Sequence, residues 1–233
     1  MLKVYKYLRN NKWAIPHLFY SILFNLYYLP FSQARYLPII CGFTQFKRMK
    51  GAIILLAPEC RFGMIEMGKP MISICGGGKF VFQNYGKIIF KGSASIGKNS
   101  KLSISNKGVV VFGDKFCATD VFRLICYKHV TFEKNVLIGY ETIVMDTNQH
   151  KLQDCEGNTV GTACESVFVG DSTWISSFCI ILPGSYIPPR CVVATRSLVN
   201  KKFSKQYCLL AGIPAKQKID NVWRNPFDDK IDY

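Results

Sequence analysis

Every sixth residue between positions 169 and 199 is β-branched and aliphatic, and this period constrains the fold more than any other feature of the chain. The six positions are Val169, Ile175, Ile181, Ile187, Val193 and Val199. Four residues after each of the first five comes a small residue, namely Thr173, Cys179, Ser185, Cys191 and Ser197. The same phase recurs less regularly at Phe132, Ile138, Val144, Ile96 and Leu102. Such a period indicates a repeat architecture, which decides the fold.

Six residues suffice for one short strand and one turn. The aliphatic residue would point inward, and the small residue would lie near a tight corner where a large side chain does not fit. Three such faces close a triangular coil of about 18 residues, and successive coils stack as parallel strands about 4.8 Å apart. We therefore predict a parallel β-helix, clear over residues 132–149 and 169–202 and looser over about 51–131.

The first 50 residues differ from the rest in charge and texture. They hold eight basic residues, and the first acidic residue of the chain is Glu59. Residues 13–31 carry no formal charge; Pro16 interrupts this run and Pro30 closes it. A helix over positions 17–29 would be about 20 Å long, short of a ~30 Å bilayer core, so it should not span a membrane. It either packs on the body of the protein or lies at an acidic lipid surface.

The cysteines indicate the cellular compartment of the protein, and the net charge indicates the kind of partner it binds. The ten cysteines include no C-x-x-C pair, which disfavours zinc-ribbon and thioredoxin-like sites. Scattered cysteines are typical of small buried residues in a reducing compartment, so we expect a cytoplasmic protein that can contact the inner membrane face. The net charge of +15 predicts an anionic partner. The aromatic and basic interleaving of RNA-binding strands is absent, so we expect no nucleic acid.

Three stretches of the chain carry a family resemblance. Val169–Ile175 reads VGDSTWI, Val193–Val199 reads VATRSLV, and Leu209–Lys216 reads LLAGIPAK. They resemble the V-x-G-D-x-x-W-I-G, V-G-A-G-S-V-V and A-G-x-P-A-K segments of the hexapeptide-repeat acyltransferases. Within that family the chain looks most like the O-acetyltransferases of maltose, galactosides and surface or capsular polysaccharides. The resemblance spans about residues 85–219.

The resemblance implies a left-handed coil, an exception to the usual right-handed crossover. The complete fold prediction is therefore all-β, a left-handed parallel β-helix of hexapeptide repeats over residues 51–219. A short basic, apolar helical segment (1–50) precedes it, a loop (150–166) interrupts it, and a C-terminal tail (220–233) follows it.

The three histidines are the candidates for a catalytic base. An alcohol that attacks an acetyl thioester needs a base that titrates near neutrality, and His is the natural choice. His17 lies in the apolar segment, and His129 lies within a coil. His150 stands where the hexad rhythm stops, and a loop leaving a rigid solenoid is where an active site is expected. The resemblance also implies a catalytic His on this loop. We predict His150, with His129 as the alternative.

Two other residues are candidates beside His150. Trp174 follows it by 24 residues, about one coil and one face, so the two could be neighbours in a solenoid. The Trp174 indole either only packs or donates its N–H to the developing oxyanion. Asp146 or Glu141 could orient the imidazole, and Asp146 is nearer in sequence.

The resemblance implies acetyl-CoA as the acyl donor and requires no metal. Ser176 and Ala194-Thr195-Arg196 stand where relatives carry glycines that admit a ligand close to the backbone. Cations of the C-terminal region would meet the phosphates of coenzyme A, or else form a solvated basic face. These cations are Arg196, Lys201, Lys202, Lys205, Lys216 and Lys218.

The predicted function is acetyl-CoA-dependent O-acetylation of a sugar hydroxyl on a surface polysaccharide or its lipid-linked precursor. The resemblance implies a homotrimer with active sites between adjacent chains. The alternatives are acetylation of an antibiotic or free sugar by the same fold, and a non-catalytic β-helix scaffold. The β-helical carbonic anhydrases share the fold but need three His ligands, and His17 lies outside the repeats.

Overall fold

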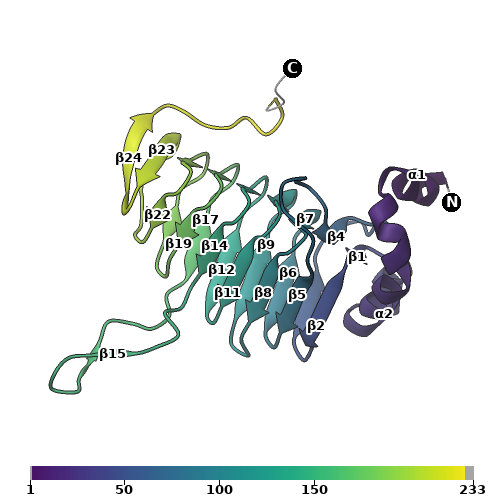
Figure 1. The fold of residues 1–233 in the computed structure, drawn as a ribbon, viewed down its shortest axis with the longest axis horizontal. Coiled ribbons are helices and arrows are strands. Elements are labelled where there is room, and N and C mark those ends of the chain that lie inside the picture. The colour runs from purple at the N-terminus through teal and green to yellow at the C-terminus, as the bar shows by residue number, and fades with distance from the viewer. Residues whose placement is uncertain (1, 229–233) are drawn as a thin grey trace.

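The computed structural model describes residues 2–228 and shows a three-sided solenoid with helices at its N-terminal end (Figure 1). Each turn of the chain contributes one strand to each of three sheets, and the strands of successive coils pair in parallel. The prediction of an all-β, left-handed parallel β-helix is confirmed.

The strands fall into three sheets, here named A, B and C in the order in which the chain visits them, and one separate hairpin. Sheet A contains β1 (Ile39–Cys41), β4 (Ile65–Lys69), β7 (Ala94–Gly97), β10 (Phe116–Ala118), β13 (Leu137–Ile138), β18 (Trp174–Ile175), β21 (Val192–Val193), β23 (Cys208–Gly212) and the antiparallel β24 (Ala215–Asp220). Sheet B contains β2 (Thr44–Arg48), β5 (Phe80–Asn84), β8 (Lys101–Ile104), β11 (Arg123–Cys126), β14 (Ile143–Met145), β19 (Ile180–Ile181) and β22 (Leu198–Val199). Sheet C contains β3 (Ala52–Leu55), β6 (Lys87–Phe90), β9 (Val109–Phe112), β12 (His129–Phe132), β17 (Val167–Val169) and β20 (Tyr186–Ile187). The hairpin consists of β15 (Leu152–Gln153) and β16 (Thr159–Val160).

The hexad positions line the interior as predicted. All six aliphatic residues from Val169 to Val199 are fully buried, and the five small residues that accompany them are at most 1% exposed. In sheet A the column runs through Ile138, Ile175, Val193 and Leu210, which are register partners in successive coils. The repeat therefore encodes a continuous aliphatic column along the solenoid axis.

The coils are longer toward the N-terminus than the hexad predicts. Trp174 pairs with Val192, which corresponds to one coil of three hexads, as expected. The pair of Cys117 and Leu137 encloses a longer piece of chain, and the pair of Ser95 and Cys117 encloses a longer one still. The early strands are correspondingly longer, because a wider coil needs longer faces.

Phenylalanine fills the wider part of the interior. Phe90, Phe112 and Phe132 form a stack with ring-centroid distances of 5.2 Å and 5.6 Å, and Phe116 packs against the latter two. Burying these rings in register stabilises the early coils in place of small β-branched residues. The hexads before residue 131 are irregular because phenylalanine replaces small aliphatic residues in this part of the interior.

The corners between the faces use left-handed backbone at the hexad period. Positive φ angles occur at Ser172, Phe178, Gly184, Arg190 and Arg196. Such a conformation turns the chain sharply within one residue, at a steric cost for all of these except glycine. The corner is thus a regular element of the repeat.

The N-terminal segment is helical, but strands begin earlier than expected. The helices are α1 (Leu2–Asn10), a 3-10 helix (Lys12–His17) that contains Pro16, α2 (Leu18–Tyr28) and α3 (Phe31–Ala34). The expected apolar helix corresponds to α2. Strands β1 and β2 already form part of the solenoid, so its first coil begins at Ile39 and not at position 51. These two strands lie outside the hexad pattern, which is why the sequence did not reveal them.

A buried carboxylate ties α1 to the solenoid. The Tyr7 hydroxyl donates a hydrogen bond to Glu66 Oε1 at 2.7 Å, and Lys69 Nζ and Ser95 Oγ each lie 2.8 Å from Glu66 Oε2. Burial, followed by the nearby Glu66 charge, raises the pKa of Tyr7 far above its ordinary value. The phenol therefore stays protonated and keeps donating to Glu66.

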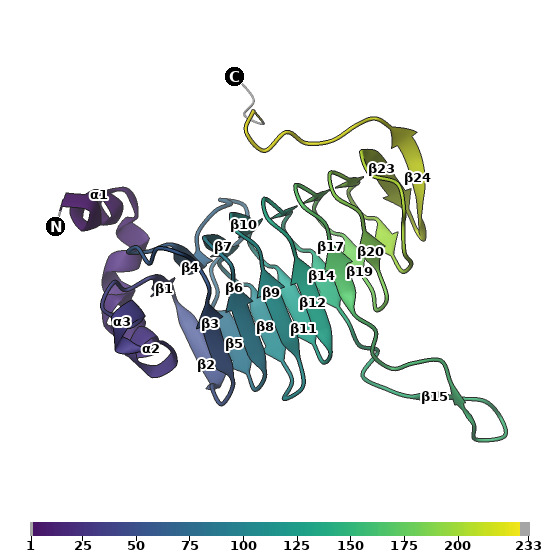
Figure 2. The ribbon, with the colours of Figure 1, turned by 180° about the vertical axis from the view of Figure 1, so that it is seen from behind.

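Two segments leave the solenoid, as Figures 1 and 2 show. The hairpin β15–β16 projects from the corner that follows β14. After β24 the chain runs back along the body toward the N-terminal end, and Arg224 Nη2 donates to the carbonyl of Asn135 at 3.0 Å. Part of the expected tail, residues 229–233, lies outside the described residues. No helix within residues 2–228 has the length and apolar character needed to cross a bilayer.

Candidate functional site

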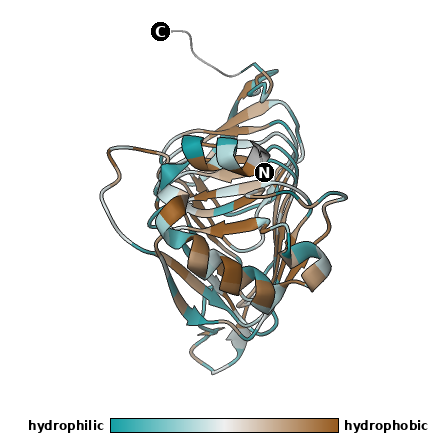
Figure 3. Ribbon diagram, turned by 90° about the vertical axis from the view of Figure 1, so that its right-hand side faces the viewer, coloured by the Kyte–Doolittle hydropathy of each residue, from teal (hydrophilic) through white to brown (hydrophobic). Residues whose placement is uncertain are grey.

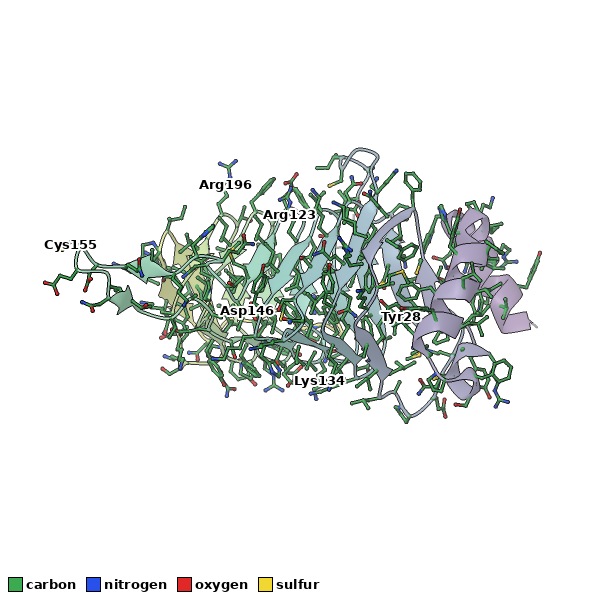
Figure 4. The ribbon with its side chains drawn as sticks, turned by 90° about the horizontal axis from the view of Figure 1, so that it is seen from below. Tyr28, Arg123, Lys134, Asp146, Cys155 and Arg196 are labelled. Carbon is green, nitrogen blue, oxygen red and sulfur yellow. The ribbon has the colours of Figure 1, made fainter. Side chains whose placement is uncertain are left out.

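His150 lies at the base of the hairpin that leaves the solenoid after β14. The hairpin, here called the arm (residues 148–164), closes on a bridge between Thr147 and Cys164 and on a hydrogen bond from Asn148 N to the Ala163 carbonyl of 2.9 Å. His150 is exposed, and so is nearly all of the arm beyond it. Figure 4 shows Cys155 at the far end of the arm, well outside the coils. The imidazole is thus open to a substrate from outside.

Asp146 is engaged in the neighbouring coil rather than with His150. Its carboxylate is fully buried and accepts hydrogen bonds from the backbone N–H groups of Tyr127 at 2.7 Å and Lys128 at 2.8 Å. The Cys126 thiol is a third donor, with Sγ 3.3 Å from Oδ2. Burial, followed by the Asp146 charge, raises the pKa of Cys126, so the thiol stays protonated and donates. The carboxylate therefore fixes the turn at Tyr127–Lys128.

The other acidic candidate, Glu141, also has a different neighbour. It stands at a corner with a positive φ, and its carboxylate lies 3.8 Å from Arg123 Nη2. His129, the alternative base, is half-buried on the outer face of sheet C in β12. Neither His129 nor Glu141 has a hydrogen bond to His150 among the described residues.

Trp174 and His150 lie on different parts of the prism within one chain. Trp174 is in β18 on the outer face of sheet A and is 37% exposed. His150 follows β14 of sheet B. Their spacing in the sequence suggested neighbours, but the register partners Leu137 and Trp174 enclose the whole arm, which makes this coil much longer than the others. Because of these extra residues, a separation of 24 residues no longer corresponds to one coil and one face, and within one chain the two side chains lie on different faces.

Four of the predicted donor-binding residues lie at the corner between sheets A and B, namely Ser176, Ala194, Thr195 and Arg196. Ser176 follows β18 and Ala194 follows β21, and the N–H of Ser176 donates to the Val193 carbonyl at 2.9 Å. Arg196 N donates to the Ser177 carbonyl at 3.2 Å, which fixes the next turn. Ser176 is nearly buried, whereas Thr195 and Arg196 are exposed. This corner is here called the A–B corner.

Arg196 lies above an aromatic ring at the A–B corner. Its guanidinium carbon is 5.7 Å from the centroid of Phe178, which occupies the matching position one coil earlier. Lys216 pairs with Ala211 in the β23–β24 hairpin that ends sheet A. Figure 4 shows Arg196 projecting from the outside of the prism. Arg196 and Lys216 can therefore meet phosphate groups at this end of the corner.

Lys201 and Lys202 lie at another corner. They follow β22 and begin the turn toward sheet C, where Tyr186 and Lys202 form an isolated bridge. The arm leaves this same B–C corner two coils earlier, after β14. The predicted cation cluster is therefore divided: Arg196 and Lys216 stand near the A–B corner, and Lys201 and Lys202 share the B–C corner with the arm. Lys205 forms a 2.7 Å ion pair with Asp220.

Contacts between basic and aromatic residues of the solenoid and its C-terminal tail were not predicted from the sequence. The Arg190 guanidinium lies over the rings of Tyr207 and Trp223, at 5.2 Å and 5.5 Å, and Lys115 Nζ lies 5.5 Å from the Phe227 centroid. Arg190 and Tyr207 are one coil apart. A spacing of one coil between a corner cation and a corner aromatic residue is the signal that would have found this pair, as well as Arg196 with Phe178.

Shallow pockets occur on the N-terminal half of the solenoid. Two adjoining ones share Arg61, Met64 and Ser93, and neither is lined by His150 or Trp174. Within residues 2–228, no group of three or more His, Cys, Asp or Glu side chains is placed to hold a metal ion.

Comparison with known proteins also finds acetyltransferases that are similar to this chain. No family model matches the chain. "Putative lipopolysaccharide biosynthesis O-acetyl transferase WbbJ" of Escherichia coli (strain K12) is 23% identical over 142 residues, covering 58% of this chain and 72% of that protein.

Solved structures of acetyltransferases show a similar arrangement. The polySia-specific acetyltransferase NeuO matches with a TM-score of 0.45 and 17% identity, over 82% of this chain and 86% of its own. A hexapeptide-repeat acetyltransferase of Vibrio cholerae O1 biovar eltor, complexed with acetyl coenzyme A, matches with a TM-score of 0.42 and 24% identity. This second match covers 48% of this chain and 60% of that one.

Proposed function

We propose that this protein is an acetyl-CoA-dependent O-acetyltransferase that acts on a sugar hydroxyl of a surface polysaccharide or its lipid-linked precursor. The observation that carries the proposal is an exposed His150 at the base of an arm that interrupts an otherwise continuous β-helix. The V-G-D-x-x-W-I block follows the arm, and the similar Escherichia coli protein bears a name from lipopolysaccharide biosynthesis.

His150 acts as the general base in this proposal. Acetyl-CoA supplies the acetyl group as a co-substrate. The imidazole accepts the proton of the sugar hydroxyl as that oxygen bonds to the acetyl carbon, and it returns the proton to the departing thiolate of coenzyme A. The Trp174 indole N–H donates to the carbonyl oxygen while negative charge develops there. The phosphates of coenzyme A are bound by Arg196 and Lys216, and its pantetheine chain passes beside Ser176, Ala194 and Thr195.

A homotrimer completes the site in this proposal. The face of sheet B separates the arm from the A–B corner within one chain, so both groups meet only if a second copy supplies one of them. The outer column of sheet B supports such packing, because Ile143, Ile180 and Leu198 are register partners that point outward and stay partly exposed. Closed threefold symmetry repeats this contact and leaves no unpaired face.

The test is thiol release from acetyl-CoA with oligosaccharide acceptors. A positioned base contributes about 10²–10⁴-fold to the rate, so His150→Ala should lose at least that factor in kcat. Binding of acetyl-CoA should stay nearly unchanged, because the imidazole moves a proton and does not hold the nucleotide.

His129→Ala is the matched control, since it removes the other imidazole of the solenoid. It should keep nearly normal turnover. Near-normal turnover of His150→Ala on the true acceptor, with loss of activity in His129→Ala, would transfer the base role to His129. Absence of thiol release by the wild-type protein with every acceptor tried would favour the scaffold alternative.

A further inference from the structure

Helix α2 presents its polar stripe to the protein and its apolar side to solvent, which is the reverse of an ordinary surface helix. Ser21, Phe24 and Asn25 are the buried residues of the helix. Asn25 Oδ1 accepts from the N–H of Ile39 at 3.1 Å, and Asn25 Nδ2 donates to the Ile39 carbonyl at 2.7 Å. Ser21 Oγ accepts from the N–H of Cys41 at 2.9 Å.

These hydrogen bonds determine which way the helix faces. Strand β1 pairs with β4 along one edge, and Ser21 and Asn25 bind the other edge, which would otherwise be the free end of sheet A. A free edge at the first coil points along the solenoid axis, away from the body. The side of α2 opposite Ser21 and Asn25 therefore forms the N-terminal end face of the molecule. Figure 3 looks onto this end and shows the helix brown with apolar residues.

The end face is rich in exposed aromatic and aliphatic side chains. Phe19 and Tyr27 are 67% and 62% exposed, and Leu23 and Leu26 are 51% and 52% exposed. The complete set, here called the end-face residues, is Ile15, Phe19, Tyr20, Ile22, Leu23, Leu26, Tyr27 and Phe31. A contiguous apolar surface of this kind marks an interaction site.

Exposed cations occur in the segments that precede and follow α2, and no Asp or Glu precedes Glu59. Six of these cations are Arg9, Lys12, Arg35, Lys47, Arg48 and Lys50. The Tyr27 hydroxyl donates to the Met49 carbonyl at 2.9 Å, which holds the turn at Lys47–Lys50 beside α2. None of the ion pairs found within residues 2–228 involves these six cations. Their charge is available to an anionic surface.

We propose that the end face binds an anionic lipid bilayer, with the end-face residues entering the headgroup region and the six cations contacting lipid phosphates. Apolar side chains flanked by Lys and Arg are the composition of interfacial helices, and Tyr is favoured at that depth. This inference deepens the membrane contact that suits a lipid-linked acceptor, and it does not depend on acetyl transfer.

A second copy of the chain is a poor occupant of this face. A twofold contact through α2 would bring both sets of cations together, and residues 2–58 contain no carboxylate side chain to pair with them. Such a contact would be repulsive, whereas anionic lipid has the complementary charge.

The proposed binding mode also fixes the height of the candidate site. If the end face lies flat on the bilayer, the solenoid axis stands upright, and His150 follows the fifth strand of sheet B, counted from β2. Four inter-strand steps of about 4.8 Å and one helix layer of about 10 Å hold His150 roughly 30 Å above the surface. The site would then reach a sugar some distance along a membrane-anchored glycan, not the sugar next to the lipid.

The test is co-flotation of the full chain with vesicles, without acetyl-CoA. Wild-type protein should float with vesicles of phosphatidylcholine and phosphatidylglycerol at about 0.05 M NaCl, and binding should fall at about 0.5 M NaCl. The double variant Leu23→Glu/Leu26→Glu should bind at least about tenfold more weakly. Its matched control, Ile74→Glu/Ile213→Glu, adds the same charges at two exposed isoleucines outside the end-face residues and should bind normally.

A second pair of variants tests the charge. Lys47→Glu/Arg48→Glu should lose at least about tenfold in binding to the anionic vesicles, since each cation near such a surface contributes about fivefold. Lys107→Glu/Lys128→Glu changes the net charge equally on the same B–C corner, two and three coils farther from the end face, and should have a much smaller effect. Circular dichroism verifies that each variant is folded.

Three outcomes would overturn the proposal. The first is failure of the wild-type protein to float with anionic vesicles, and the second is equal loss of binding in the variants and their controls. The third is a smaller particle mass of Leu23→Glu/Leu26→Glu in light scattering, which would make the end face a contact between chains. The first two outcomes leave thiol release unchanged, so the failure of this proposal and of the acetyltransferase proposal can be told apart.

Discussion

Replacing the buried carboxylate of Asp146 should loosen the fold without removing the chemistry. Its two backbone hydrogen bonds, to Tyr127 N at 2.7 Å and Lys128 N at 2.8 Å, are charge-assisted. Each is worth about 1.5–3 kcal/mol. Asp146→Asn keeps one acceptor oxygen and loses about 2 kcal/mol of unfolding free energy. For a chain of this size that lowers Tm by roughly 4–8 °C.

Asp120 offers a matched control far from the arm. It is also fully buried, and it accepts backbone hydrogen bonds from Met71, Ile72 and Lys98 at 3.1–3.2 Å. Asp120→Asn should lower Tm by a similar amount. Both variants should keep kcat within about threefold below their melting temperatures, because neither carboxylate is bonded to His150.

Urea unfolding and thiol-release kinetics, measured on the same preparations, decide the question. The structural reasoning is refuted if Asp146→Asn keeps its stability within about 0.5 kcal/mol and loses about a hundredfold in kcat. That result would mean that the carboxylate orients the His150 imidazole during turnover. An equal kcat loss in Asp120→Asn would instead attribute the effect to a loosened solenoid.

Four other outcomes are expected. Trp174→Phe should lose about 10²-fold in kcat if the indole N–H serves the oxyanion, and a loss of only about twofold would leave a packing role. Light scattering should give about 80 kDa, three times the chain mass of 26.4 kDa, and an active monomer would contradict the trimer. Cys155, exposed on the arm, should react first with a thiol reagent, whereas burial raises the pKa of Cys191 to about 12 and delays its reaction until unfolding. Burial also raises the pKa of Cys41 above its ordinary value of 9.0, so ionisation of this thiol favours the unfolded chain above about pH 9. The urea midpoint should therefore stay level below about pH 9 and fall progressively as the pH rises above it.

The interior of the solenoid is the part that the sequence determined by itself. A strict six-residue period is satisfied when every sixth side chain points into a stacked coil. The six hexad positions between Val169 and Val199 are buried in this way. The position of His150 beside an interruption was equally readable, because the end of a strict repeat is visible without coordinates. Each of these features depends on residues that are close together in the chain.

Only the tertiary structure decided the features that depend on register between distant segments. The inserted arm placed Trp174 on a face away from His150, and Asp146 found its donors in the preceding coil, at Tyr127 and Lys128. The cations that are close in sequence were divided between two corners, since each six-residue step turns the chain onto a new face. The stripe of Ser21 and Asn25 was visible in the sequence, but the direction in which it faces depends on the free edge of β1. The backbone N–H and C=O groups of that edge need hydrogen-bond partners, and Ser21 and Asn25 supply them, which leaves the apolar side of α2 exposed to solvent.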